Sequence, residues 1–138
     1  MVILDGAHNP SKIKSTISNL ANLKFDALHL VIGMAEDKDR VGILKQIIPL
    51  AHRVFVTRFQ NPERKCAHPK DLFFKAKRYL KKGAKIQMYL EPEQALDEAM
   101  KRARPRDLVL VTGSFFLAGE LRRRWYSEEW VLTRRTSF

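Results

Sequence analysis

The chain has 138 residues, of which 45% are hydrophobic and 30% are charged, a composition typical of one globular domain and unlike that of disordered proteins. Lysine and arginine outnumber aspartate and glutamate by 26 to 15, and the resulting formal charge of +11 predicts an anionic partner. The single cysteine, Cys66, excludes an internal disulfide and a cysteine-based zinc site. No apolar run reaches the roughly 18–20 residues of a membrane span, so we expect one cytoplasmic domain over residues 1–138.

Short apolar segments alternate with helical patterns along the chain. The predicted strands are residues 2–4, 28–33, 53–57, 84–90 and 108–112, with a further edge strand at 130–132. The predicted helices are residues 10–23, 41–48, 71–80, 92–103 and 114–124. Asn9 and Pro10 form a good helix start, because Asn can accept an unpaired N–H and Pro suits the first helical position. This alternation predicts an α/β fold: a three-layer, Rossmann-like domain with a mostly parallel sheet of five to six strands and helices on both faces.

The positive charge is concentrated in residues 58–85, which hold ten basic and two acidic side chains. This stretch also contains Phe73, Phe74 and Tyr79. Basic residues interleaved with aromatic ones are found on nucleic-acid-binding faces, where the rings stack on bases. The spacing of the rings is that of the buried face of a helix with its lysines in solvent, and we favour this interpretation.

In a parallel sheet, ligands bind in the loops that follow the carboxyl ends of the strands. The first such loop, residues 5–10, precedes a helix N-terminus, where anions are favoured. There Asp5 could accept hydrogen bonds from a ribose and His8 could donate to a phosphate, or both could satisfy the backbone of the turn.

Two more loops follow buried strands. Residues 33–39 hold three carboxylates, which suit either a magnesium ion or, as we favour, the start of a helix. Ser114 follows the apolar strand 108–112 and could present its hydroxyl to an anion or cap the next helix. The chain has neither a Walker A sequence nor a G-x-G-x-x-G motif, so a P-loop kinase and a dinucleotide dehydrogenase are not supported. The other histidines show no ligand spacing and are predicted to be structural or on the surface: His29, His52 and His68.

Three segments, residues 4–10 (LDGAHNP), 33–39 (GMAEDKD) and 111–120 (VTGSFFLAGE), resemble in order and spacing the C-terminal domain of the folylpolyglutamate synthase / dihydrofolate synthase family. That family belongs to the Mur ligase superfamily. The resemblance implies an ATP-dependent ligase with ATP and Mg²⁺ as cofactors. ATP would phosphorylate a folate or pteroate carboxylate, and the amine of L-glutamate would attack the acyl phosphate. An N-terminal domain with the P-loop and the Mg²⁺ ligands would be needed, so these residues alone are expected to be inactive.

The resemblance also implies roles for individual residues. Asp5, His8 and Asn9 would bind the nucleotide, with Asp5 at the ribose. His8 would lie between phosphate and glutamate as the catalytic candidate, and Ser114 would contact a glutamate carboxylate together with His8. The interdomain cleft would be lined by three further residues: Asp37, Lys38 and Asp39. No metal ligand is expected in this domain.

Two alternatives stay open. The first is a noncatalytic basic module that binds RNA or another polyanion, although the three motifs disfavour nucleic acid. The second is a fragment of a Mur-type peptidoglycan ligase, which would share the fold and differ in its acceptor. The choice between dihydropteroate and a folate as acceptor would be made largely in the N-terminal domain.

Overall fold

The computed structural model describes residues 1–126. Within them five strands form one sheet in the order β1-β5-β2-β3-β4, and each neighbouring pair is parallel. The strands are β1 (Val2–Leu4), β2 (Leu28–Ile32), β3 (Arg53–Val56), β4 (Lys85–Met88) and β5 (Leu108–Thr112). The helices are α1 (Pro10–Leu20), α2 (Arg40–Ile47), α3 (Pro69–Lys77), α4 (Pro92–Arg102) and α5 (Phe115–Arg122), with a 3-10 helix at Ile48–Leu50. The predicted edge strand at 130–132 lies outside the described residues.

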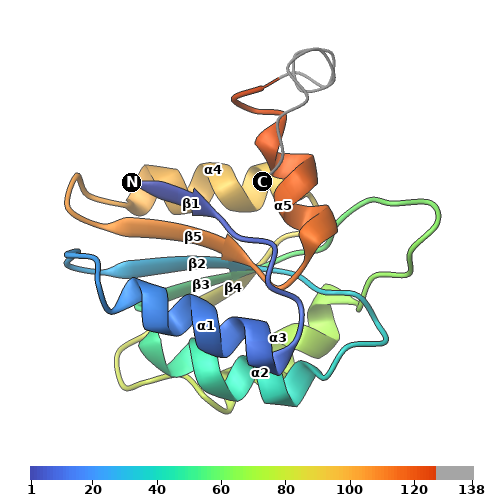
Figure 1. The fold of residues 1–138 in the computed structure, drawn as a ribbon, viewed down its shortest axis with the longest axis horizontal. Helices are drawn as coiled ribbons and strands as arrows, with labels where there is room; N and C mark the ends of the chain where they lie inside the picture. The colour runs from blue at the N-terminus through green and yellow to red at the C-terminus, as the bar shows by residue number, and fades with distance from the viewer. Residues whose placement is uncertain (127–138) are drawn as a thin grey trace.

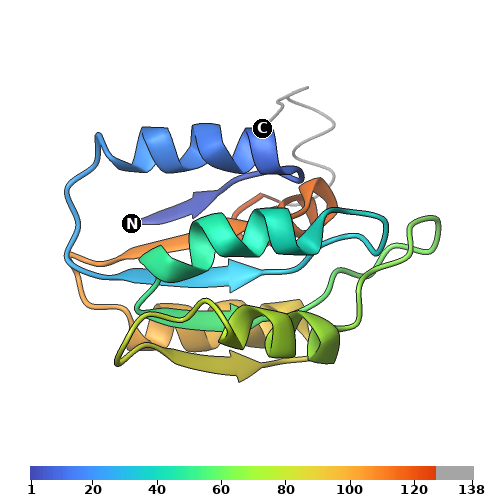
Figure 2. The same cartoon turned by 90° about the horizontal axis from the view of Figure 1, so that it is seen from below.

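Helices cover both faces of the sheet, as predicted. Figure 1 shows α4 and α5 on one face and α1, α2 and α3 on the other, and Figure 2 shows α1, α2 and α3 spread across their face. Because side chains alternate along a strand, β2 contributes to both layers. Leu30 and Ile32 belong to the core under α1, α2 and α3, whereas Val31 belongs to the core under α4 and α5.

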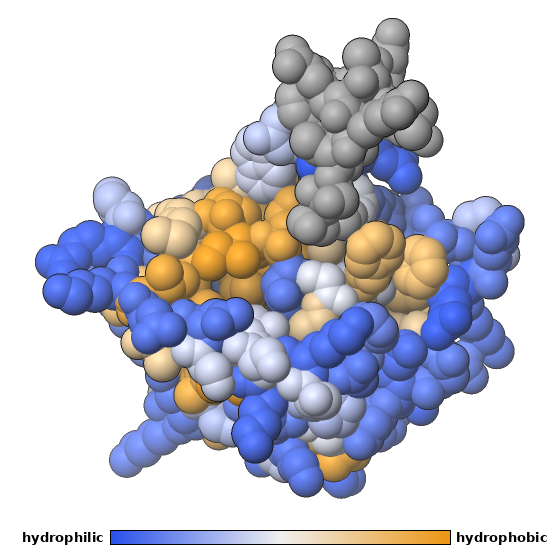
Figure 3. Space-filling view, in the orientation of Figure 1, coloured by the Kyte–Doolittle hydropathy of each residue, from blue (hydrophilic) through white to orange (hydrophobic). Residues whose placement is uncertain are grey.

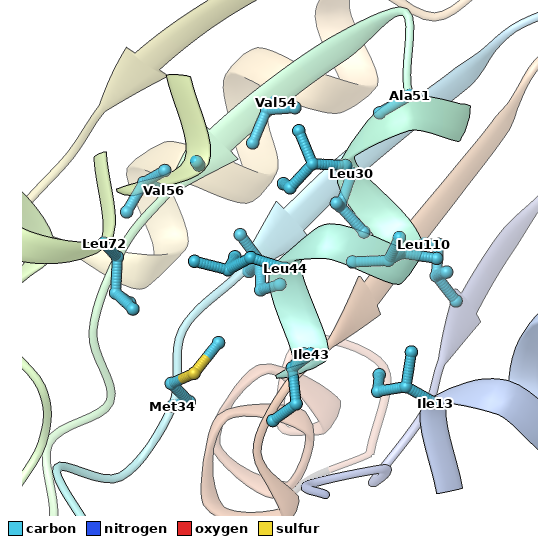
Figure 4. Packing of buried hydrophobic residues seen from close by; sticks show 14 of the residues in the cluster. Ile13, Leu30, Met34, Ile43, Leu44, Ala51, Val54, Val56, Leu72 and Leu110 are labelled. Atoms are coloured by element: carbon cyan, nitrogen blue, oxygen red, sulfur yellow. The ribbon is translucent and has the colours of Figure 1, made fainter. Parts of the chain in front are cut away.

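The larger core lies between the sheet and the first three helices. Figure 4 shows Leu44 of α2 among side chains from α1, β2, β3, α3 and β5. Leu30 and Leu110 come from the interior strands β2 and β5, and both are fully buried. Burial of one such side chain contributes about 1.5–3 kcal/mol to the free energy of folding. These contacts therefore hold β2 and β5 in place, and with them the loops that follow the two strands. Within residues 1–126 no helix is long and apolar enough to cross a membrane.

Side-chain caps decide where α1, α2 and α3 begin. Asn9 caps α1 as predicted, with its Oδ1 accepting from the backbone N–H of Lys12 at 2.8 Å. Asp39 caps α2, and its Oδ1 accepts from the N–H of Gly42 at 2.9 Å. α3 begins at Pro69, two residues before the predicted start, because Nδ1 of His68 accepts from the N–H of Lys70 at 3.1 Å.

The aromatic residues of the basic stretch do not all face the core. Phe73 and Tyr79 pack against the larger core as predicted. Phe74 is 56% exposed, so its predicted place on the buried face of the helix is wrong. Each residue turns an α-helix by about 100°, and Phe74 is two positions from both Leu72 and Ala76, which are two of the buried residues of α3. Phe74 must therefore point away from the face that those two residues define.

A buried hydrogen bond between His29 and Asp107 stabilises the amino end of the sheet. His29 of β2 is 3% exposed, and its Nε2 lies 2.9 Å from Oδ2 of Asp107. Asp107 also accepts from the backbone N–H groups of Ala27 at 3.2 Å and Arg104 at 3.0 Å. Nδ1 of His52 accepts from the N–H of Leu28 at 3.0 Å. The histidines predicted to be structural therefore hold backbone or buried groups in place.

Candidate functional site

The loops that follow β1, β2 and β5 meet at the carboxyl edge of the sheet around a hollow of about 300 Å³. Its polar walls come from loops far apart in the sequence: His8, Lys38, Arg64 and Ser114. Phe115 and Phe116 line it as well, and they are 52% and 37% exposed, in keeping with the apolar side chains that Figure 3 shows at the start of α5. The hollow thus combines two cations, a hydroxyl and an imidazole with an apolar wall.

Glycine allows two of these loops to approach each other closely. Gly113 has a φ of +101°, in the region that L side chains rarely adopt. A Cβ at this position would lie 2.5 Å from the carbonyl oxygen of Gly33, so no side chain fits. The N–H of Gly113 also donates to the carbonyl of Ala7 at 3.0 Å, which ties the loop after β5 to the loop after β1.

The orientation of the His8 ring is set by its own loop. Nδ1 lies 3.0 Å from the carbonyl oxygen of Gly6. A carbonyl can only accept, so Nδ1 carries a proton and donates it. In the neutral ring, Nε2 therefore holds the lone pair, and His8 can offer a proton acceptor to a ligand in the hollow.

Ser114 is both the cap of α5 and a wall of the hollow. Its Oγ accepts from the N–H groups of Phe116 at 3.1 Å and Leu117 at 3.3 Å, and the residue is 2% exposed. The capping interpretation is therefore confirmed. The hydroxyl hydrogen can still be donated, because both contacts use Oγ as an acceptor. A contact between this hydroxyl and a glutamate carboxylate stays a prediction.

Asp5 joins the ends of three elements. Its Oδ2 accepts from the hydroxyl of Thr112 at 2.7 Å, the hydroxyl of Thr16 at 3.0 Å and the N–H of Ala7 at 3.3 Å. One carboxylate oxygen thus holds β1, α1 and β5 in register at the edge of the site. Neither Asp5 nor Asn9 lines the hollow with His8, and their contacts with a nucleotide stay predictions.

The acidic residues after β2 are engaged by cations and by a helix end. Nη2 of Arg64 donates to both carboxylate oxygens of Asp37, at 3.1 Å each. Oε2 of Glu36 lies 3.3 Å from Nζ of Lys65. With Asp39 capping α2, the predicted start of a helix is confirmed. In residues 1–126, no three His, Cys, Asp or Glu side chains are grouped so as to hold a metal ion. Of this loop, Lys38 is the predicted residue that reaches the hollow.

Comparison with known proteins decides the family. Residues 1–115 match the family model described as "Mur ligase, glutamate ligase domain". The chain belongs to this family. The glutamate ligase domain is 32% identical over 139 residues to a probable bifunctional folylpolyglutamate synthase/dihydropteroate synthase of Haloferax volcanii, covering 98% of this chain and 16% of that protein. A protein of the same description from Halobacterium salinarum is 33% identical over 126 residues, covering 91% of this chain and 15% of that protein.

Solved structures agree with the sequence comparison. E. coli FolC in complex with DHPP and ADP has a TM-score of 0.76 and 27% identity, covering 98% of this chain and 29% of that one. Mycobacterium tuberculosis folylpolyglutamate synthase complexed with ADP and AMPPCP has a TM-score of 0.79 and 28% identity, covering 91% and 29%. The resemblance inferred from the three motifs is confirmed. The glutamate ligase domain spans about a sixth of the curated relatives and under a third of these two solved chains.

The glutamate ligase domain also contains a site residue that the sequence analysis missed, Arg64. It lies in the long loop after β3. The other loops were selected because they follow the carboxyl ends of strands, and this loop meets the same criterion. Glu120 of α5 anchors the loop by accepting from the N–H of Gln60 at 2.8 Å, and burial raises the pKa of this carboxyl. Burial likewise raises the pKa of the Cys66 thiol, which disfavours the reactive thiolate form.

Proposed function

We propose that this glutamate ligase domain serves an ATP-dependent ligase that joins L-glutamate to a folate or pteroate carboxylate. The observation that carries the proposal is the hollow in which His8, Lys38, Arg64 and Ser114 come together from four loops. The naming of the relatives as folylpolyglutamate synthases supports the choice of substrates. The remainder of such an enzyme, an N-terminal domain with a P-loop, is the partner that residues 1–138 require for activity.

The walls of the hollow match the chemistry of glutamate. Lys38 and Arg64 supply positive charge for its two carboxylates, and the Ser114 hydroxyl can donate to one of them. The amine must be unprotonated to attack an activated carboxyl group. His8 is the proposed catalytic residue, because the Nε2 lone pair of its neutral ring can take a proton from that amine.

The nucleotide is proposed to lie beside the loop after β1. Relatives have been solved with ADP, AMPPCP, or AMPPNP and a Mn ion. Since Oδ2 of Asp5 already accepts three hydrogen bonds, its Oδ1 is the oxygen proposed for a ribose hydroxyl. When bound, ATP supplies the phosphoryl group that activates the carboxylate. The described residues do not fit a metal ion, so the Mg²⁺ ligands are assigned to the N-terminal domain.

A chimaera tests this proposal directly. The matching segment of E. coli FolC would be replaced by this chain, and ATP-dependent incorporation of labelled L-glutamate would be measured. Activity should be present and should fall by about tenfold or more in the Ser114→Ala and His8→Ala variants, as expected when a group that contacts substrate is lost. Lys101→Ala, on the exposed side of α4, is the matched control and should retain activity. A folded chimaera whose activity is unaffected by both site variants would refute the residue assignments.

A further inference from the structure

Two buried threonine hydroxyls hold one oxygen of the Asp5 side chain. Oγ1 of Thr112, the last residue of β5, donates to Oδ2 of Asp5 at 2.7 Å. Oγ1 of Thr16, in α1, donates to the same oxygen at 3.0 Å. Thr112 is fully buried and Thr16 is 9% exposed, whereas Asp5 is partly exposed. Of the three side chains, Asp5 is therefore the one that a ligand can reach.

The two threonines do not constrain Asp5 equally. A hydroxyl has a single hydrogen to donate. Oγ1 of Thr16 also lies 3.1 Å from the carbonyl oxygen of Lys12, which can only accept, as an ionised carboxylate can. The hydrogen of Thr16 is thus divided between two acceptors. Across the described residues, the hydroxyl of Thr112 donates to Asp5 alone. Thr112 is therefore the main constraint on the carboxylate.

The backbone of the loop after β1 is held without the help of this hydroxyl. The N–H of Asp5 donates to the carbonyl of Val111 at 2.8 Å, and the N–H of Gly113 donates to the carbonyl of Ala7 at 3.0 Å. β1 also pairs with β5 along its whole length, and Figure 1 shows the two strands side by side. Loss of the Thr112 hydroxyl would therefore release the Asp5 side chain and leave its backbone in place.

We infer that Thr112 is a positioning residue for nucleotide recognition: its hydroxyl holds the Asp5 carboxylate so that Oδ1 faces a ribose hydroxyl. This inference rests on the proposed function, in which Asp5 contacts the ribose. A side chain that is free to rotate loses rotamer freedom when it binds a ligand, and this loss weakens binding. Since three donors already hold Oδ2, that freedom is lost on folding and not on binding.

The arrangement makes Thr112 a determinant of the class of nucleotide. A ribose hydroxyl can donate to Oδ1, whereas a dideoxyribose has no hydroxyl to offer. A site built to bond a hydroxyl rejects the analogue that lacks it, because the polar group of the protein is left without a partner. The rejection depends on a carboxylate that cannot turn away to find another partner. The bond from Thr112 supplies this restraint.

The test is an NMR titration of this 138-residue chain with ADP and, separately, with 2′,3′-dideoxy-ADP. The unchanged chain should bind ADP about tenfold more tightly, as expected for a hydrogen bond to a charged group. Thr112→Val keeps the branched shape but lacks the donor, and it should lower this ratio by about threefold or more. Thr112→Ser keeps the hydroxyl and should preserve the ratio.

Thr57→Val is the matched control. Thr57 is fully buried, follows β3 at the same edge of the sheet, and has no hydrogen-bond partner for its hydroxyl in the part of the chain that the structure describes. The same chemical change there should leave the ratio unaltered. Thr16→Val is a second test from another element, and it should lower the ratio less than Thr112→Val does. Circular dichroism spectra check that each variant is folded.

The outcomes separate this inference from the proposed function. A folded Thr112→Val variant that keeps the full ratio would overturn the inference and leave the contact between Asp5 and the ribose standing. Equal weakening of both nucleotides by Thr112→Val would also overturn it, because the hydroxyl would then have a structural role alone. If the unchanged chain bound the two nucleotides equally, or bound neither, the ribose contact itself would be refuted, and the inference with it.

Discussion

Removal of the Asp107 carboxylate should be among the most destabilising single changes at the amino end of the sheet. The side chain is 7% exposed and accepts three hydrogen bonds, from His29 at 2.9 Å and from two backbone N–H groups at 3.0 and 3.2 Å. A buried donor that loses its acceptor costs about 1–3 kcal/mol. Asp107→Ala leaves three such donors, those of His29, Ala27 and Arg104, so we expect it to lower the free energy of unfolding by about 3 kcal/mol or more.

The assay is urea unfolding at neutral pH, followed by circular dichroism, with Asp26→Ala as the control. Asp26 carries the same charge and faces Arg106 at 3.5 Å, but the two side chains are 58% and 83% exposed. Such a surface pair contributes between about 0 and 1 kcal/mol. If Asp107→Ala lowered the free energy of unfolding by no more than Asp26→Ala does, the energetic argument for the buried pair would be refuted.

The same variants should differ in acid. The hydrogen bond from the N–H of Arg104, followed by that from His29, lowers the pKa of Asp107 in the folded state. A carboxyl with a lowered folded pKa stabilises the protein fully above its unfolded pKa, about 3.9, and this stabilisation is lost as the pH falls through the folded value. Below about pH 4 the wild type should therefore lose stability more steeply than Asp107→Ala.

Three further changes have expected outcomes in the same unfolding assay. Ser114→Ala should cost about 1 kcal/mol through loss of the α5 cap, and Ser114→Asp, which can still cap, should cost less. Gly113→Ala should cost about 1–3 kcal/mol because its φ is positive and its Cβ would strike the Gly33 carbonyl, and an unchanged stability would contradict the close approach. Partial burial and the Lys81 charge lower the pKa of His52 in the folded state. The neutral ring therefore contributes to the stability of the fold above about pH 6.5, and this contribution is lost as the pH falls. His52→Asn should flatten the dependence of the unfolding free energy on pH in this range.

The fold was predictable because its main signals are local. The apolar segment 108–112 reads as a buried parallel strand, and β5 does lie in the interior of the sheet. Asn9 before Pro10 marks a helix start through chemistry contained in four residues. The order of the strands was not predicted, since it depends on which hydrophobic faces pack together across the whole chain.

The site was predictable in part for the same reason. His8, Lys38 and Ser114 lie in loops after strands and also within the three motifs, so two signals select them. Arg64 lies in the loop after β3, which the strand rule selects as well, but this loop has no recognisable motif to single out one residue. Phe74 was mispredicted for a different reason. Its apolar character suggested burial, but whether a helix side chain is buried depends on which face of the helix packs against the sheet.

The pairing of β1 with β5 has a consequence for the order in which the molecule forms. In the described sheet β1 pairs with β5 alone, and Val2 is partnered by Val109. During synthesis β1 therefore has no partner strand until more than a hundred further residues have been made. His8 and Ser114 meet only at that point, through the bond from Gly113 to Ala7. A ribosome-bound chain that ends before β5 can bury β2, β3 and their helices, but it cannot yet hold a ligand between these two loops.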